Sequence, residues 1–185
     1  MSVPLRLFIA AEPPEGVCAE LVRWALGALG RAGPARRLPA RSLHLTLAFL
    51  GEQPPSALAE IESALSGVLE QFVAVEQLAV GAPAWLPPRR PRVLAVEVGD
   101  PSGALATLRR ALAGELGTAI GWQAPRERFR PHITLARMRP GSERPRALEP
   151  TPPLVFTPVA LTLFRSDLDP AGALYAPLAS IPPAR

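Results

Sequence analysis

The chain contains two histidines, and both begin nearly the same five-residue sequence. His44 opens the run His-Leu-Thr-Leu-Ala and His132 opens the run His-Ile-Thr-Leu-Ala, so a threonine, Thr46 or Thr134, follows each histidine two positions later. A match of this length at the only two histidines indicates an internal repeat. A duplicated supersecondary unit would carry residues that perform the same task twice.

Each motif is expected to lie on a β-strand, and strand geometry then fixes which side chains act together. Residues two positions apart on a strand project to the same face, about 7 Å from each other. His44 therefore shares a face with Thr46, and His132 with Thr134, while the apolar residues between them turn toward the core. Two such strands related by a pseudo-twofold axis would bring two imidazoles and two hydroxyls to one cleft.

This set of groups suits the hydrolysis of a phosphodiester. Two imidazoles that titrate near neutrality can act as general acid and general base in one reaction. Two hydroxyls can donate hydrogen bonds to the non-bridging oxygens of a tetrahedral phosphate and stabilise the charge of the transition state. Arg130, two residues before His132, offers a further charge-assisted donor to the phosphate. The mechanism requires no metal ion.

Other chemistries fit the sequence less well. A zinc site needs three or four ligands, and two histidines without a carboxylate at a suitable spacing do not supply them. A Ser-His-Asp triad would use one histidine and leave the repeat unexplained, and the chain has no Gly-x-Ser-x-Gly motif. It also contains no lysine, which excludes a P-loop and ligation through a lysyl-nucleotide intermediate.

The elements that must position the motifs are a mixture of strands and helices. Hydrophobic periodicity, with Gly and Pro as breaks, predicts strands over residues 5–10, 42–50, 72–80, 92–98, 132–138, 154–164 and 173–178, and helices over 15–31, 57–70 and 100–117. Ser56 is the expected N-cap of the second helix, and Gly51 is expected to end the second strand. Some strands follow one another directly, which favours an α+β fold with a largely antiparallel sheet.

The composition is that of a globular protein with a small excess of positive charge. Of the 185 residues, 48% are hydrophobic, and 20 basic residues, all arginines, outnumber 16 acidic ones for a formal net charge of +4. This surplus is compatible with a polyanionic partner but does not establish one. The arginines form short clusters, including one at Arg36, Arg37 and Arg41, and for any single cluster a solvated face is the simpler interpretation.

Cysteine and hydropathy patterns bear on the compartment. Cys18 is the only cysteine, so the chain has no internal disulfide and no cysteine-rich metal site. The apolar stretch near the N-terminus is too short for a signal peptide, and no segment reaches the length of a transmembrane helix. These patterns predict a soluble, cytoplasmic protein that does not associate with membranes.

The two His-x-Thr motifs resemble those of the two-histidine (2H) phosphoesterase superfamily. The closer similarity is to its bacterial and archaeal RNA 2′,3′-cyclic phosphodiesterases, also called 2′-5′ RNA ligase-like proteins. Further segments extend the resemblance over nearly the whole chain: 6–10, 44–51, 129–137, 164–166 and 172–175. Because the chain contains no lysine, only arginine is available where relatives use lysine near the phosphate or RNA.

The resemblance implies that residues 1–185 form a single bilobal domain. Its two pseudo-symmetric lobes of mainly antiparallel sheet, with outer helices, would surround a central basic cleft. The implied activity is metal-independent and cofactor-free hydrolysis of the terminal 2′,3′-cyclic phosphate of RNA to a 2′-phosphate. By similarity, His44 is the proton donor to the leaving 3′ oxygen and His132 the proton acceptor that activates water, while Thr46 and Thr134 hold the phosphate. The partner is an RNA or oligonucleotide end, and the protein is expected to be a monomer.

Two other functions remain open at this point. Joining RNA halves through a 2′-5′ linkage is the reverse reaction, and microscopic reversibility lets the same four residues perform it. A non-catalytic module that binds RNA or nucleotides would change its affinity, with no turnover to lose, when the histidines are replaced.

Two further residues are candidate nucleotide contacts. Phe49 could stack on a nucleobase, but strict alternation from His44 turns it to the opposite face and favours packing in the core. Arg165 lies near the end of a predicted strand, in one of the segments that resemble the family, and is a candidate for the cleft.

Overall fold

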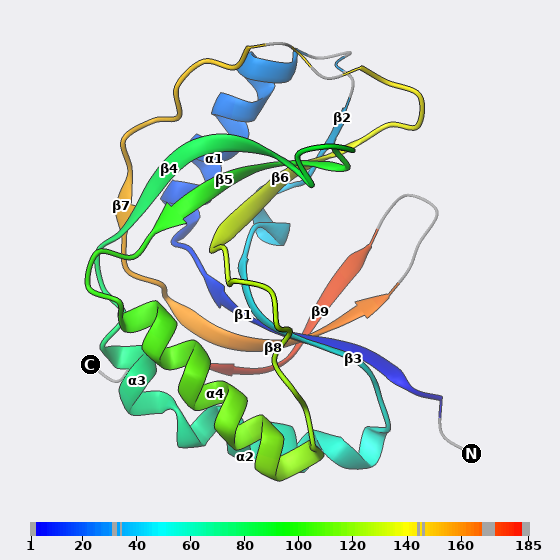
Figure 1. The fold of residues 1–185 in the computed structure, drawn as a ribbon, viewed down its shortest axis with the longest axis vertical. Coiled ribbons are helices and arrows are strands. Elements are labelled where there is room, and N and C mark those ends of the chain that lie inside the picture. The colour runs from blue at the N-terminus through cyan, green and yellow to red at the C-terminus, as the bar shows by residue number, and fades with distance from the viewer. Residues whose placement is uncertain are drawn as a thin grey trace.

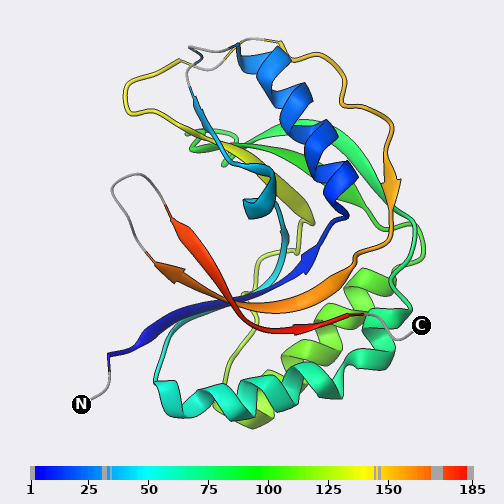
Figure 2. The same ribbon diagram turned by 180° about the vertical axis from the view of Figure 1, so that it is seen from behind.

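Over the described residues, the fold consists of one antiparallel sheet of nine strands with four α-helices packed against it (Figures 1 and 2). The computed structural model describes residues 3–30, 33, 35–143, 145, 147–167 and 173–182. The strands are β1 Leu5–Glu12, β2 Ala35–Arg37, β3 Leu45–Gln53, β4 Leu78–Leu86, β5 Val93–Gly99, β6 His132–Met138, β7 Val155–Phe156, β8 Ala160–Asp167 and β9 Leu174–Ile181. The helices are α1 Glu15–Leu29, α2 Leu58–Gly67, α3 Leu69–Val73 and α4 Ala104–Ile120, with 3-10 turns η1 Ala40–Ser42 and η2 Pro55–Ala57. The α+β prediction is confirmed.

The strand order is symmetric about the two strands that carry the histidine motifs. The order is β7-β4-β5-β6-β3-β1-β8-β9, with β2 on β6, and every pair in it is antiparallel. Its centre lies between β6 and β3. We call β2, β4, β5, β6 and β7 the β6 lobe, and β1, β3, β8 and β9 the β3 lobe.

Each repeat consists of a strand, a helix and the strand with the histidine motif. In the first repeat these are β1, α1 and β3, and in the second they are β5, α4 and β6. Leu5 and Val93, which begin β1 and β5, are separated along the chain by the same number of residues as His44 and His132. Each helix packs on the opposite lobe, since α1 contacts β2 and β6 while α4 contacts β3. The predicted duplication is therefore present in the fold.

The lobes meet where the motifs begin. A single ladder pair, Leu45 opposite Ile133, joins β3 to β6. These two residues are equivalent in the repeat, because each directly follows its histidine, and the pseudo-twofold axis passes between them. The ribbons of the two lobes diverge from this junction (Figure 1).

The underside of both motifs is part of the core. Leu45, Leu47, Ile133 and Leu135 are all buried and belong to one apolar cluster that extends through both lobes. This confirms the expectation that the residues between and after His and Thr anchor each motif from below.

Several predicted helix and strand boundaries are wrong; for example, the predicted strand 154–164 is two strands, β7 and β8. Helix 57–70 is interrupted at Val68, which separates α2 from α3, and its N-cap is Ala57 rather than Ser56. Phe72, expected in a strand, is a buried residue of α3, and β4 begins only at Leu78. Apolar residues that suit a buried strand also suit a short buried helix, so periodicity alone could not separate the two.

Two further boundaries differ for reasons of local geometry. The helix expected from residue 100 begins at Ala104, because the Asp100 and Ser102 side chains accept hydrogen bonds from the backbone N–H groups of Ala106 and Ala104, at 3.2 Å each, and cap it from the preceding turn. Gly51 does not end β3. It takes the left-handed conformation, φ 71°, beside an irregularity in the pairing with β1, and the strand continues to Gln53.

The first helix ends at Leu29, two residues before its expected end at residue 31, which lies outside the described residues. Residue 172, the first of the segment 172–175 that resembles the family, also lies outside them. Across the portion of the chain that is described, none of the helices is both long and apolar enough to cross a bilayer.

Candidate active site

The register of the lobe junction brings the four motif residues together. Because Leu45 lies opposite Ile133 on an antiparallel strand, His44 comes opposite Thr134, and Thr46 comes opposite His132. Side chains opposite each other on neighbouring strands have Cβ atoms about 4.5–5.5 Å apart. Each imidazole is therefore beside the hydroxyl of the other repeat, on the face of the sheet away from the core.

Both imidazoles are held by the same local contact. The Nδ1 atom of His44 lies 2.9 Å from the carbonyl oxygen of Ser42, and Nδ1 of His132 lies 2.8 Å from the carbonyl oxygen of Arg130. A carbonyl oxygen only accepts, so each Nδ1 carries a hydrogen and donates it. Each Nε2 is left as the nitrogen that can accept or deliver a proton.

His44 lies in an aromatic environment. Its ring centroid is 4.8 Å from that of Phe8, 5.1 Å from Tyr175 in an edge-on arrangement, and 6.1 Å from Phe164. The pKa of His44 is lowered to about 4, mainly by burial and to a smaller extent by Arg137 and His132, while the hydrogen bond to the Ser42 carbonyl acts in the opposite direction. In the free protein His44 is therefore neutral at pH 7.

A β-bulge follows each motif and changes which residues face the cleft. Ala10 pairs with Thr46 and Ile9 with Ala48, which leaves Leu47 as the extra residue in β3. In β6 the extra residue is Leu135, because Ala95 pairs with Thr134 and Leu94 with Ala136. A bulge shifts the alternation by one residue. The fifth residue after each histidine thereby turns to the cleft face.

Those fifth residues are Phe49 and Arg137, and both line the cleft. Phe49 is 48% exposed, so the prediction that it packs in the core is wrong, and the bulge at Leu47 is the reason. The guanidinium of Arg6 lies 4.8 Å from the centre of the Phe49 ring. Arg137 is not among the predicted site residues; strict alternation from His132 would turn it to the opposite face, although the repeat makes it the counterpart of Phe49.

The cleft between the lobes is a cavity of about 410 Å³. His44, Thr46 and Thr134 line it, together with Arg6, Phe8, Leu38, Phe49, Arg137, Ser166, Ala173 and Tyr175. No Asp or Glu is among the described residues that line it. The hydroxyl of Tyr175 accepts a hydrogen bond from Nη2 of Arg137, 3.3 Å away. The cleft therefore combines arginine charge, hydroxyl groups and an apolar wall, as an anionic ligand with a nucleobase requires.

The remaining candidate residues lie at the edge of the cleft or beyond it. His132 is outside the lining set, yet its charge acts on His44, and its strand partner in β5 is Glu97. Arg130 forms an ion pair with Glu97, 3.0 Å between Nη2 and Oε1. Arg165 pairs with Asp167 at 2.9 Å. Since Phe164 and Ser166 face the cleft, alternation turns Arg165 to the other side of β8.

Two side chains support the β3 bulge from behind. Arg109 of α4 donates from Nε to the carbonyl oxygen of Leu47, 3.3 Å away, and its guanidinium lies 4.5 Å from the centre of the Phe129 ring. Trp122 donates from Nε1 to the carbonyl oxygen of Phe49 at 3.0 Å. These bonds fix the backbone on both sides of the bulge, which holds Thr46 and Phe49 in their orientation.

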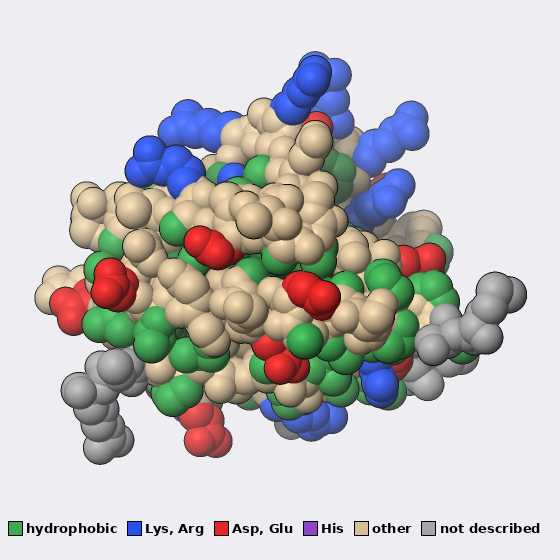
Figure 3. All heavy atoms as spheres, turned by 90° about the horizontal axis from the view of Figure 1, so that it is seen from below, with side chains coloured by type: hydrophobic (Ala, Val, Ile, Leu, Met, Phe, Trp, Pro, Cys, Tyr) green, Lys and Arg blue, Asp and Glu red, His purple; other side chains and the backbone are tan. Residues whose placement is uncertain are grey.

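The outer surface differs from the cleft in its charge. Over the face formed by α2, α3 and α4, acidic side chains are scattered, no histidine is visible, and arginine side chains gather along one rim (Figure 3). Within the described residues, no group of three or more His, Cys, Asp and Glu side chains is arranged to hold a metal ion.

The low pKa of His44 can be measured directly. A protein with His132→Ala contains one imidazole, so its nitrogen NMR signals belong to His44 alone. We expect this imidazole to titrate well below the ordinary value of about 6.5, with the hydrogen of its neutral form on Nδ1. Inorganic phosphate should raise the midpoint, because a nearby anion favours the charged form. A midpoint of ordinary value that phosphate does not move would contradict the description of the site.

Comparison with known proteins gives a consistent result. The family model of the 2′-5′ RNA ligase superfamily matches residues 13–170. The RNA 2′,3′-cyclic phosphodiesterase of Escherichia coli is 34% identical over 182 residues, which cover 96% of this chain and 96% of that protein. The RNA 2′,3′-cyclic phosphodiesterase of Thermus thermophilus is 33% identical over 188 residues, covering 94% and 88%.

Solved structures share the fold over nearly their whole length. TT0787 of Thermus thermophilus superimposes with a TM-score of 0.73 at 27% identity, covering 96% of this chain and 97% of that one. LigT of Escherichia coli in complex with 3′-AMP gives a TM-score of 0.71 at 26% identity, covering 98% and 99%.

Proposed function

The chain belongs to the 2′-5′ RNA ligase superfamily, and on that basis we propose that it hydrolyses the terminal 2′,3′-cyclic phosphate of RNA to a 2′-phosphate without a metal ion. The observation that carries the proposal is the pairing of Leu45 with Ile133, since this register brings each motif histidine opposite the threonine of the other repeat. The family relatives named above act on the same class of substrate by name.

The proposed reaction is an attack of water on the cyclic phosphate. His132 accepts a proton from water through Nε2, and the water oxygen forms a bond to phosphorus. The bond from phosphorus to the 3′ oxygen breaks, and His44 delivers the proton from its Nε2 to that oxygen. The products are a 3′-hydroxyl and a 2′-phosphate, and the two histidines exchange protonation states during the step.

The donor role of His44 sets a condition on the order of events. Its pKa of about 4 leaves the imidazole neutral in the empty cleft at pH 7. The cyclic phosphate carries a negative charge, and an anion within about 4–6 Å favours the imidazolium. We therefore infer that His44 takes up its proton when substrate binds, so that the acid is charged only when a phosphate is present.

The other groups stabilise the charge that develops on phosphorus. In the proposal, Thr46 and Thr134 donate hydrogen bonds to the two non-bridging oxygens from opposite sides of the pseudo-twofold axis. Arg137 and Arg6 supply positive charge from the wall of the cleft. Arg130 can add a donor after it releases the carboxylate of Glu97. Residues 1–185 act as one bilobal unit in this scheme, because each lobe contributes one half of the site.

An assay on a short RNA with a 2′,3′-cyclic phosphate end tests the proposal. Turnover should persist in EDTA, because imidazoles and hydroxyls already supply acid, base and donors, and 31P NMR should identify the product as a 2′-phosphate. A preparation with both histidines replaced by alanine controls for contaminating nucleases. A strict requirement for a divalent ion, or a 3′-phosphate product, would refute the mechanism.

A further inference from the structure

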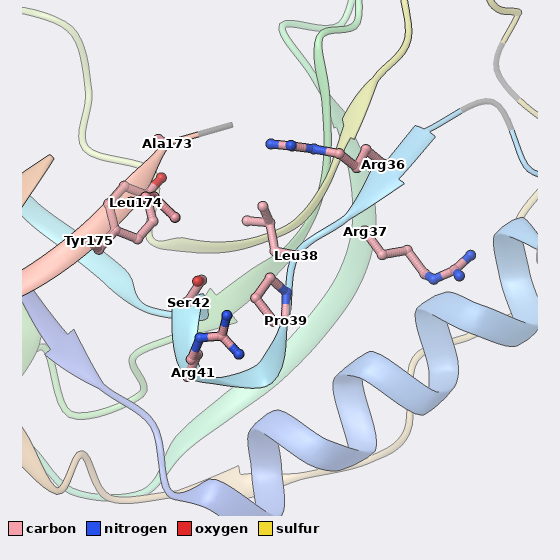
Figure 4. A pocket seen from close by; sticks show the side chains of 9 residues that line it. All are labelled: Arg36, Arg37, Leu38, Pro39, Arg41, Ser42, Ala173, Leu174 and Tyr175. Carbon is pink, nitrogen blue, oxygen red and sulfur yellow. The ribbon is translucent and has the colours of Figure 1, made fainter. Parts of the chain in front are cut away.

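A second cavity, of about 260 Å³, adjoins the active-site cleft and is rich in arginine. We call it the arginine pocket, with Arg36, Arg41, Ser42, Leu38 and Tyr175 among its lining residues (Figure 4). Leu38 and Tyr175 also line the cleft, so the two cavities share a wall. Ser42 connects them as well, because its carbonyl oxygen accepts the hydrogen bond from His44.

The charges in this pocket lack acidic partners. Arg36 of β2 lies directly opposite Arg137 of β6. Like charges at opposite positions of two strands destabilise a sheet. Among the described residues, neither of these arginines nor Arg41 forms an ion pair with a carboxylate, and no Asp or Glu lines the pocket. An anion bound beside Arg36 would relieve the repulsion between Arg36 and Arg137.

The side chains of Arg36 and Arg37 point in opposite directions. Arg36 extends from β2 toward Ala173 and Tyr175, across the pocket, whereas Arg37 turns the other way, toward α1 (Figure 4). Arg37 donates from Nη1 to the carbonyl oxygen of Gly30 at 2.6 Å. Arg37 is thus engaged in the fold, while Arg36 and Arg41 line the pocket and, within the described residues, form no ion pair.

We propose that the arginine pocket binds the phosphate on the 5′ side of the terminal nucleoside, while the cyclic phosphate occupies the cleft. This inference rests on the proposed function, and it assigns the substrate class as an oligonucleotide whose last internucleotide phosphate contacts Arg36 and Arg41. Arginine suits this task because its planar guanidinium can donate two parallel hydrogen bonds to phosphate oxygens. A nucleoside 2′,3′-cyclic phosphate without a 5′-phosphate leaves the pocket empty.

The test compares three substrates: a nucleoside 2′,3′-cyclic phosphate, the same compound with a 5′-phosphate, and a dinucleotide that ends in a cyclic phosphate. We expect the wild type to favour the dinucleotide in kcat/KM by about tenfold or more, the value of one charge-assisted hydrogen bond. The double variant Arg36→Gln/Arg41→Gln should lose this preference and keep its activity on the unphosphorylated nucleoside. It should also show a shallower dependence of kcat/KM on salt for the dinucleotide.

A matched variant, Arg23→Gln/Arg110→Gln, removes the same charge from exposed positions on α1 and α4 and should behave as the wild type. A gain with the 5′-phosphorylated nucleoside equal to that of the dinucleotide would support a phosphate site in the pocket and overturn the assignment of an oligonucleotide as the substrate. The inference is overturned if the wild type does not distinguish the substrates, if the double variant keeps the preference, or if it loses activity equally on all three. If the wild type turns over none of them, the proposed function itself fails.

Discussion

Replacement of either histidine by alanine is expected to lower turnover of a 2′,3′-cyclic phosphate by at least about a hundredfold, the usual loss when a positioned acid or base is removed. In the proposed mechanism His44 and His132 have separate roles, so neither can substitute for the other. Replacement by glutamine is the matched variant, because it keeps a polar side chain of similar reach but cannot transfer a proton. It should lose activity to the same extent, whereas near-normal turnover in any of these proteins would make that histidine structural.

The residual activity of the single variants should distinguish donor from acceptor. With His132→Ala, the remaining step needs a protonated His44, so kcat/KM should fall as the pH rises above about 4, the pKa of His44 in the free protein. With His44→Ala, the remaining step needs a neutral His132, so kcat/KM should fall as the pH decreases. The wild type should show a bell whose limbs belong to the pair of imidazoles. Opposite slopes in the two variants would reverse the roles.

Loss of the threonine hydroxyls is expected to have the next largest effect. Thr46→Ala and Thr134→Ala should each lower kcat by roughly ten- to a thousandfold, because each removes one donor to the phosphate in the transition state. Thr46→Ser and Thr134→Ser keep the hydroxyl and should retain most of the activity.

Thr107→Ala provides the control for these variants, since Thr107 is exposed on α4 and its hydroxyl donates to Gly103 of the same helix. It should leave kcat unchanged. If both alanine variants of the motif threonines also kept the full rate, other groups would have to hold the phosphate.

The repeat and its underside could be predicted because they depend on local sequence. Strand β6 spans 132–138 as expected, since the histidine motif lies on alternating polar and apolar positions. The burial of Leu45 and Ile133 follows from the same alternation. These features require only that the strand has one face in the core, which a single segment already shows.

The bulges could not be predicted in this way, and they are the reason that Phe49 and Arg137 face the cleft. The bulge at Leu47 adds one residue to β3 relative to its partner strand β1. Arg109 of α4 and Trp122, which follows α4, hydrogen-bond to the β3 backbone at this place, so the bulge depends on distant parts of the chain. Nothing in the five residues of the motif marks it. The packing of α1 and α4 on the opposite lobe likewise depends on the assembled core and not on a single segment.

Arg130 shows a related limit. Its position two residues before His132 predicts a place near the phosphate, but its ion pair is with Glu97, which lies opposite His132 on β5. The register between β5 and β6 determines this partner. That Arg130 contacts phosphate stays a prediction, and such a contact would have to compete with the carboxylate of Glu97.

The pairing of Leu45 with Ile133 is the contact that a homodimer with an exact twofold axis would make between a strand and its own copy. In such an isologous assembly both imidazoles would have identical surroundings. With both repeats in one polypeptide, the surroundings differ: His44 lies among aromatic rings, while His132 has a carboxylate as its strand neighbour. A single chain can therefore keep its two histidine motifs at symmetric positions and still place the two imidazoles in different environments.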